Sequence, residues 1–152
     1  MSGTRWSDVA VTVVAALDAA LSCDVFDGPP TSGDTLADFV CIGHRPDAQE
    51  PSAGSIEQEY HDLGPAATKE ERGEIACYAS SWDGDADLPA TRARAFALLE
   101  QIQTVLRADQ TLGLTGVRAP EIELSTGSIA QGYTTSGVRV DLTFTLSYIT
   151  LV

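Results

Sequence analysis

Three aspartates at alternate positions are the residues of this chain whose spacing comes nearest to a metal site. Asp83, Asp85 and Asp87 match the first, third and fifth positions of an EF-hand calcium loop. Such loops also need a glycine at position six and a bidentate glutamate at position twelve. This chain has Leu88 and Arg94 there. The leucine does not permit the sharp turn and the arginine repels a cation, so we expect no metal.

The same aspartates can be interpreted as the start of a helix. Aspartates before a helix accept hydrogen bonds from unpaired N–H groups and complement the helix dipole, which contributes about 0.3–1 kcal/mol each. Pro89 falls in the first turn, where its missing N–H costs nothing. An apolar stripe then predicts a helix over residues 88–109, with Arg92, Arg94 and Arg107 on it. The stripe consists of Ala95, Leu98, Leu99, Ile102, Val105 and Leu106.

The sequence contains few residues that could perform nucleophilic catalysis. Such catalysis needs a nucleophile, a base and an orienting group, but His44 and His61 are the only histidines and no serine lies in a Gly-x-Ser-x-Gly elbow. Cys23, Cys41 and Cys77 lie in apolar stretches without the paired spacing of zinc ligands. We interpret them as small buried side chains. The sequence therefore offers no candidate catalytic, cofactor-binding or metal-ligating residue, and we expect a protein that is not an enzyme.

Two pairs of carboxylates stand at strand spacing. Glu57 and Glu59, and likewise Glu121 and Glu123, fall on one face of a strand. Paired carboxylates can perform acid–base chemistry. In a chain with 22 acidic and 9 basic residues, a solvated strand face is the better interpretation.

Composition and charge exclude several classes of function. The 152 residues suit a single domain, 1–152. The net charge is −13, and the basic residues are scattered. Binding to DNA, RNA or an anionic membrane surface needs a basic patch, so none is expected. No segment has the length to span a membrane.

The elements that position these residues follow from periodicity and turn residues. Ser7 or Asp8 is the expected cap of a first helix over residues 7–22. A loop is expected at 44–55, and Gly127 or Gly132 is expected to end the strand that contains Ile122. The other strands are expected at residues 23–26, 39–43, 56–63, 74–82 and 138–148.

The strand pattern also indicates the fold class. In the 74–82 strand, Ile75, Cys77 and Ala79 occupy one face, while Ala76, Tyr78 and Trp82 occupy the other. We expect an α+β fold, with a mainly antiparallel or mixed β-sheet and two helices packed on one face. The final strand is the clearest element, because six apolar residues alternate with polar ones. They are Val138, Val140, Leu142, Phe144, Leu146 and Tyr148.

The order of local sequences resembles that of a known family. Val25-Phe26-Asp27-Gly28-Pro29-Pro30, Phe39-Val40-Cys41-Ile42-Gly43, Glu71-Arg72-Gly73-Glu74-Ile75, Trp82-Asp83-Gly84-Asp85, Arg92-Ala93-Arg94-Ala95 and a threonine-rich closing strand follow one another. In this order the chain resembles the tail terminator proteins of long-tailed actinobacterial phages, and the related minor tail and tail-completion proteins of prophages. The resemblance covers nearly the whole chain but contains no catalytic signature.

The resemblance implies a structural role in the virion tail, assembled in the host cytoplasm. Such proteins form a hexameric ring on the tail tube, stop its growth and join it to the head connector. The implied partners are further copies of the chain, the tail-tube protein and the head–tail connector protein, with DNA passing through without specific binding. An acidic lumen fits that passage. The threonine face of the last strand and the loops at 28–38 and 44–55 are the expected ring contacts.

Two alternatives remain open from the sequence. One is a generic, non-catalytic α+β ligand-binding or regulatory domain. The other is a metal-dependent enzyme that uses Asp83, Asp85 and Asp87.

Overall fold

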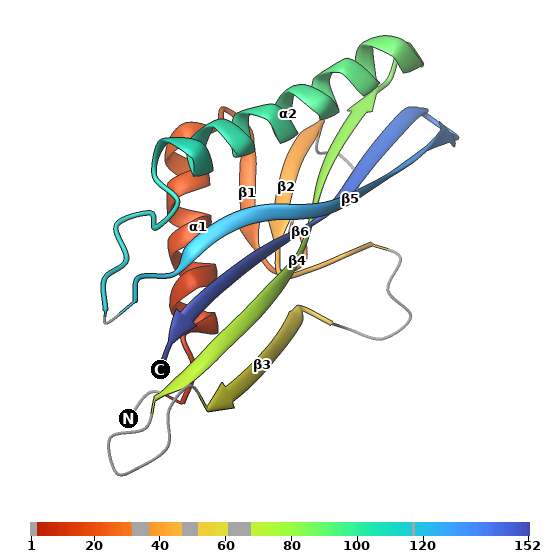
Figure 1. Cartoon of the computed structure of the whole chain (residues 1–152). Helices are drawn as coiled ribbons and strands as arrows, with labels where there is room; N and C mark the ends of the chain where they lie inside the picture. The colour runs from red at the N-terminus through yellow and green to blue at the C-terminus, as the bar shows by residue number, and fades with distance from the viewer. Residues whose placement is uncertain (1–2, 32–36, 47–51, 61–67, 117) are drawn as a thin grey trace.

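A computed structural model of the chain describes residues 3–31, 37–46, 52–60, 68–116 and 118–152. The described residues form one mixed sheet and two helices (Figure 1). In chain order the elements are α1 (Trp6–Ala20), β1 (Asp24–Asp27), β2 (Asp38–Ile42), β3 (Gly54–Tyr60), β4 (Lys69–Asp83), α2 (Leu88–Ala108), β5 (Glu121–Thr134) and β6 (Gly137–Leu151).

The sheet is built around the long strand β4. Its strand order is β1-β2-β4-β6-β5, and β3 also pairs with β4. β2 pairs with the second half of β4 and β3 with the first half, so β2 and β3 follow one another along the same edge of β4. Among the described strands, β1 and β2 form a parallel pair and the other four pairs are antiparallel. The expected α+β class with a mixed sheet is therefore confirmed.

Both helices cover the same face of the sheet (Figure 1), as the sequence pattern predicted. The strand faces are also as predicted, because Ile75, Cys77 and Ala79 point into the helix-covered core. All six alternating apolar residues of β6 are buried on this side. Burying an aliphatic or aromatic side chain stabilises the fold by about 1.5–3 kcal/mol, so this layer contributes most of the stability. The helical residues of the core include Val9, Val13, Leu17, Leu98, Ile102 and Leu106.

The opposite face carries no helix among the described residues. Where β1, β2 and β4 adjoin, this face has a small aromatic cluster in which Phe39 makes edge contacts with Phe26 and Tyr78, with ring centroids 6.0 and 5.6 Å apart. The guanidinium of Arg139 lies 5.8 Å from the centre of the Phe39 ring. The rest of this face carries mostly charged and hydroxyl side chains, with Ala76, Trp82 and Ile149 among them. We call the whole face the helix-free face.

The expected start of the first helix is wrong in detail. The helix begins at Trp6, and Arg5 at the N-cap makes no side-chain cap, so neither Ser7 nor Asp8 has that role. The unpaired N–H groups find other partners. The Thr4 hydroxyl accepts from the N–H of Trp6 at 3.1 Å, and Glu71 of β4 accepts from the N–H of Arg5 at 2.9 Å.

The expected ends of three strands are also wrong. β5 runs through Gly127 and Gly132 without ending, because continuous pairing with β6 fixes its backbone, and only a bulge between Leu124 and Thr126 interrupts the register. β4 begins at Lys69 and not at residue 74, and β3 begins at Gly54, since these two strands pair along their whole shared length. Among the described residues, neither helix is both long and apolar enough to cross a bilayer.

Candidate functional site: the acidic helix-free face

The acidic turn before α2 is a helix start. Asp87 is the N-cap, and its carboxylate accepts from the N–H of Ala90 at 3.2 Å. Asp83 accepts from the N–H of Asp85 at 2.9 Å. The predicted capping function is therefore confirmed at Asp87.

Arg94, which replaces the twelfth-position glutamate of a calcium loop, returns to this turn. Its guanidinium donates to the carbonyl of Trp82 at 2.7 Å and to Asp38 at 3.1 Å, and it lies 3.9 Å from the Asp83 carboxylate. A cation of the protein itself thus occupies the neighbourhood of Asp83. Within the described ranges, no three histidine, cysteine or acidic side chains are arranged to hold a metal.

The cysteines are unsuited to nucleophilic chemistry. Cys41 and Cys77 are buried and Cys23 is half-buried. Burial raises the pKa of Cys23 and Cys41 to about 11 and that of Cys77 to about 12. These thiols stay protonated near neutral pH, and the thiol is a poor nucleophile. His44 packs against Tyr78, with ring centroids 6.0 Å apart, while His61 lies outside the described residues.

The sheet brings the two glutamate pairs of the sequence onto one face. Glu57 of β3 stands opposite Arg72 of β4, which stands opposite Ile149 of β6, which stands opposite Glu121 of β5. Directly opposed residues point to the same side of a sheet. The neighbouring rows of opposed residues contain the second glutamate of each pair, Glu59 and Glu123, and two further glutamates of β4, Glu70 and Glu74. In one row Glu59 stands opposite Glu70, and in another Glu74 and Glu123 stand on either side of Ser147.

This acidic area of the helix-free face has more anions than cations. Both nearby arginines bind the same glutamate: Arg72 lies 3.1 Å and Arg118 3.6 Å from the carboxylate of Glu70. The remaining five glutamates are exposed and make no ion pair with a described residue. The area is therefore a negatively charged surface. Its six glutamates are Glu57, Glu59, Glu70, Glu74, Glu121 and Glu123.

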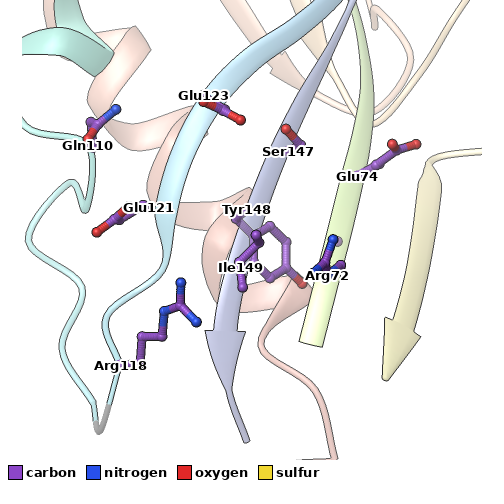
Figure 2. Close-up of a pocket in the computed structure, with 10 residues that line it drawn as sticks. Arg72, Glu74, Gln110, Arg118, Glu121, Glu123, Ser147, Tyr148 and Ile149 are labelled. Atoms are coloured by element: carbon purple, nitrogen blue, oxygen red, sulfur yellow. The ribbon is translucent and has the colours of Figure 1, made fainter. Parts of the chain in front are cut away.

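A shallow groove of about 300 Å³ lies at one end of this area. Figure 2 shows Glu121 and Glu123 on β5, Ser147 on β6 and Glu74 on β4, with Arg118 contributed by the loop before β5. Ligand pockets span roughly 300–1,000 Å³ and are mostly apolar. The groove is at the lower limit of that range and its named side chains are largely charged, so it is a weak candidate for a small-molecule site.

The threonine face of the last strand is less accessible than the sequence indicates. Thr145 is only 8% exposed. The guanidinium of Arg45 crosses it and donates to the Thr145 hydroxyl and to the carbonyl of Phe144. Thr143 is half-buried and bonded to the hydroxyl of Ser128. Of the two loops expected to make ring contacts, residues 32–36 and 47–51 lie outside the described residues.

Sequence reasoning missed one buried carboxylate. Glu71 lies before the strand expected at residues 74–82, yet it is fully buried on the helix side of β4. It accepts hydrogen bonds from the Thr4 hydroxyl and from the N–H of Arg5. Burial, and then the nearby Glu71 charge, raises the pKa of the Tyr148 hydroxyl. No local signal in the sequence predicts this position, because it depends on the pairing of distant segments.

Comparisons with known proteins do not add a relative. No protein-family model matches the chain, and no curated protein is significantly similar to it.

Proposed function

We propose that this chain is a structural subunit of a phage tail, similar to the tail terminators. In this function it forms a hexameric ring on the end of the tail tube, stops tube growth and joins the tail to the head connector. The observation that supports the proposal best is the acidic area of the helix-free face. There six glutamates are accompanied by two arginines, both bound to Glu70.

The acidic area has the charge that a DNA passage needs. Retaining DNA requires lysines or arginines that replace the counterions of the phosphates. Exposed carboxylates repel phosphates and keep the duplex from adhering to the wall. With the helix-free face towards the lumen, α1 and α2 form the outer layer of the ring. Glu74 and Glu123 then lie in the lumen wall.

The experiment is light scattering of the full chain with and without the tail-tube protein of the same phage. The expected result is a stable complex in which six subunits of 16.0 kDa each join the end of the tube. A chain that stays monomeric in both conditions and does not bind the tube protein contradicts the proposal. Some proteins of this kind stay monomeric until they meet the tube. The measurement with the tube protein is therefore the one that tests the proposal.

The groove beside Arg118 supports a second candidate function, a non-catalytic ligand-binding or regulatory domain. That function predicts a saturable rise in melting temperature with one class of small molecule. Replacing Glu121 with alanine abolishes such a rise if the groove is the site. A screen without any saturable shift excludes this candidate and leaves the tail proposal unaffected.

A further inference from the structure

Two edge strands of the sheet carry the same exposed sequence pattern. β3 contains Ile56-Glu57-Gln58-Glu59-Tyr60, and β5 contains Ile129-Ala130-Gln131-Gly132-Tyr133. Six large apolar side chains are exposed in the described part of the chain, and four of them belong to these two segments. Their exposed fractions are 47% for Ile56, 65% for Tyr60, 47% for Ile129 and 72% for Tyr133.

We call the shared sequence the Ile-x-Gln-x-Tyr pattern. In both strands the Ile, Gln and Tyr side chains of this pattern point to the helix side of the sheet. Ile56 stands opposite Gly73, which stands opposite the buried Tyr148, and Ile129 stands opposite the buried Leu142. The two strands lie on opposite sides of the β4–β6 pair, as the strand order and Figure 1 show. One edge of the sheet therefore carries the pattern of β3, and the other edge carries the pattern of β5.

β3 and β5 differ in the charge of the two residues that alternate with Ile, Gln and Tyr. On the helix-free side, β3 has Glu57 and Glu59 where β5 has Ala130 and Gly132. The whole stretch 124–138 contains no charged residue, in a chain whose net charge is −13. Edge strands are usually protected from pairing by charges. The part of β5 after Glu123 lacks this protection and is a neutral edge on which a second acidic copy can pair without repulsion.

We propose that β5 of one copy pairs antiparallel with β3 of a second copy of this chain. The register places Ile129 opposite Tyr60 of the partner subunit, and Tyr133 opposite Ile56 of the partner subunit. Aromatic and β-branched side chains in direct opposition stabilise a strand pair. On the other side, Ala130 and Gly132 stand opposite the two β3 glutamates, so no carboxylate stands opposite another.

The two glutamines at the centre of the patterns are complementary. Within one copy, Gln58 donates through Nε2 to the carbonyl of Gly3. Gln131 accepts at Oε1 from Nη1 of Arg92 at 3.3 Å. The proposed register places the Nε2 donor of Gln131 opposite the Oε1 acceptor of Gln58 of the partner subunit. Each amide can therefore keep its bond within its own subunit and add one across the contact.

Pairing of like strands is less favourable. Two β3 strands centred on Gln58 place Glu57 opposite Glu59, and like charges in direct opposition destabilise a strand pair. Two β5 strands centred on Gln131 can pair Ile129 with Tyr133, but they leave Ile56 and Tyr60 of both copies exposed. Only the β5–β3 contact covers both patterns.

This inference rests on the proposed ring and specifies the contact between its neighbouring subunits. The β5–β3 contact joins two different surfaces, so it repeats head to tail and can close into a ring. A continuous sheet of this kind also keeps the helix-free face of every copy on the same side. The glutamates of all copies then line one common surface.

Disulfide trapping tests the register in the full chain. In a Cys23→Ser background, Gln58→Cys and Gln131→Cys are combined in one chain and oxidised mildly at high protein concentration. The expected result is a ladder of trimers and longer chains on a non-reducing gel. Each single variant alone stays monomeric, and an equal mixture of the two gives dimers only. Gln58→Cys with Ser128→Cys is the matched control, because residue 128 points to the other side of β5.

Two trapping results contradict the inference. Dimers from Gln131→Cys alone indicate β5–β5 pairing, and the absence of cross-links in the double variant, when it is oxidised together with the tail-tube protein, excludes the contact. Charge reversal provides an independent test: Ala130→Glu lowers the association constant about fivefold, because it opposes Glu59, and adding Glu59→Lys restores it. A ring on the tail tube that assembles equally well with Ala130→Glu contradicts the β5–β3 contact while the proposed function stands.

Discussion

The N–H of Arg5 donates to Oε2 of Glu71 across 2.9 Å, although the two residues are 66 positions apart. The bond joins the start of α1 to the first half of β4. Glu71 also accepts from the hydroxyl of Thr4 and is fully buried. The start of the first helix is therefore held by a strand residue, Glu71, together with the hydroxyl of Thr4, and not by the side chain of its N-cap residue.

Replacing Glu71 with alanine is expected to destabilise the fold by about 1.5–3 kcal/mol, the range for a hydrogen bond to a charged group. The change leaves the N–H of Arg5 without its partner at a partly buried site. Urea unfolding at neutral pH measures the effect. Glu74→Ala is the matched control, because Glu74 is an exposed glutamate of the same strand, and its effect should stay within about 0.5 kcal/mol. Equal effects of the two variants contradict the buried role of Glu71.

Gly73→Ala is expected to cost about 1–3 kcal/mol by overpacking. A Cβ at this position would overlap the ring of Tyr148, which is only 2% exposed and has little room to move. Gly132→Ala in β5 is the control, because a Cβ there meets nothing within 4 Å. Thermal unfolding of the two variants should separate them clearly, and a neutral Gly73→Ala shows that Tyr148 can shift.

The sequence was sufficient for the elements that depend on local periodicity. The alternation in β6 and the apolar stripe of α2 predict their elements and their buried faces correctly. The extent of β5 was not predictable from its glycines, since the pairing partner β6 holds Gly127 and Gly132 in the strand.

The composition of the acidic area also depends on pairing between distant segments. Glu57 and Glu121 share a face only because β3 and β5 join the sheet in a particular register. A register shift of one residue moves a side chain to the other face, and the sequence alone does not specify that register. The Ile-x-Gln-x-Tyr repeat is likewise too short to interpret until both segments are seen on sheet edges.

Asp87→Ala is expected to destabilise the protein by about 0.5–2 kcal/mol, because the variant loses the N-cap of α2. Its carboxylate accepts from the N–H of Ala90. Asp85→Ala removes a neighbouring exposed aspartate that caps nothing, and should change the unfolding free energy by less than about 0.5 kcal/mol. Chemical denaturation distinguishes the two. A larger loss at Asp85 indicates that this aspartate has a function beyond the turn.

The stability of the fold is expected to decline at alkaline pH. Burial raises the pKa of the Cys77 thiol from 9.0 to about 12. The folded state therefore favours the protonated thiol, and its stabilising effect is complete below pH 9 and is lost as the pH rises towards 12. Linkage predicts a loss of about 1.4 kcal/mol per pH unit in that window for one such group. Urea unfolding at pH 8 and pH 10 measures it, and Cys77→Ala should reduce the slope without removing it, because burial also raises the pKa of Cys23 and Cys41 to about 11. An unchanged slope in that variant assigns the effect to other groups.

Reversing the charge of the acidic area is expected to create DNA binding. Glu74, Glu121 and Glu123 are exposed on the helix-free face, and their replacement by lysine supplies the cations that release counterions from phosphates. Fluorescence anisotropy with a labelled duplex at about 50 mM salt should show binding that disappears at about 200 mM. The control carries the same number of lysines in place of Asp8, Asp18 and Glu100 on the helices. In the assembled ring, the lysines that replace Glu74, Glu121 and Glu123 lie together along the wall of the lumen. This variant should therefore bind DNA more tightly than the control. Equal binding by both variants means that the helix-free face does not line the passage.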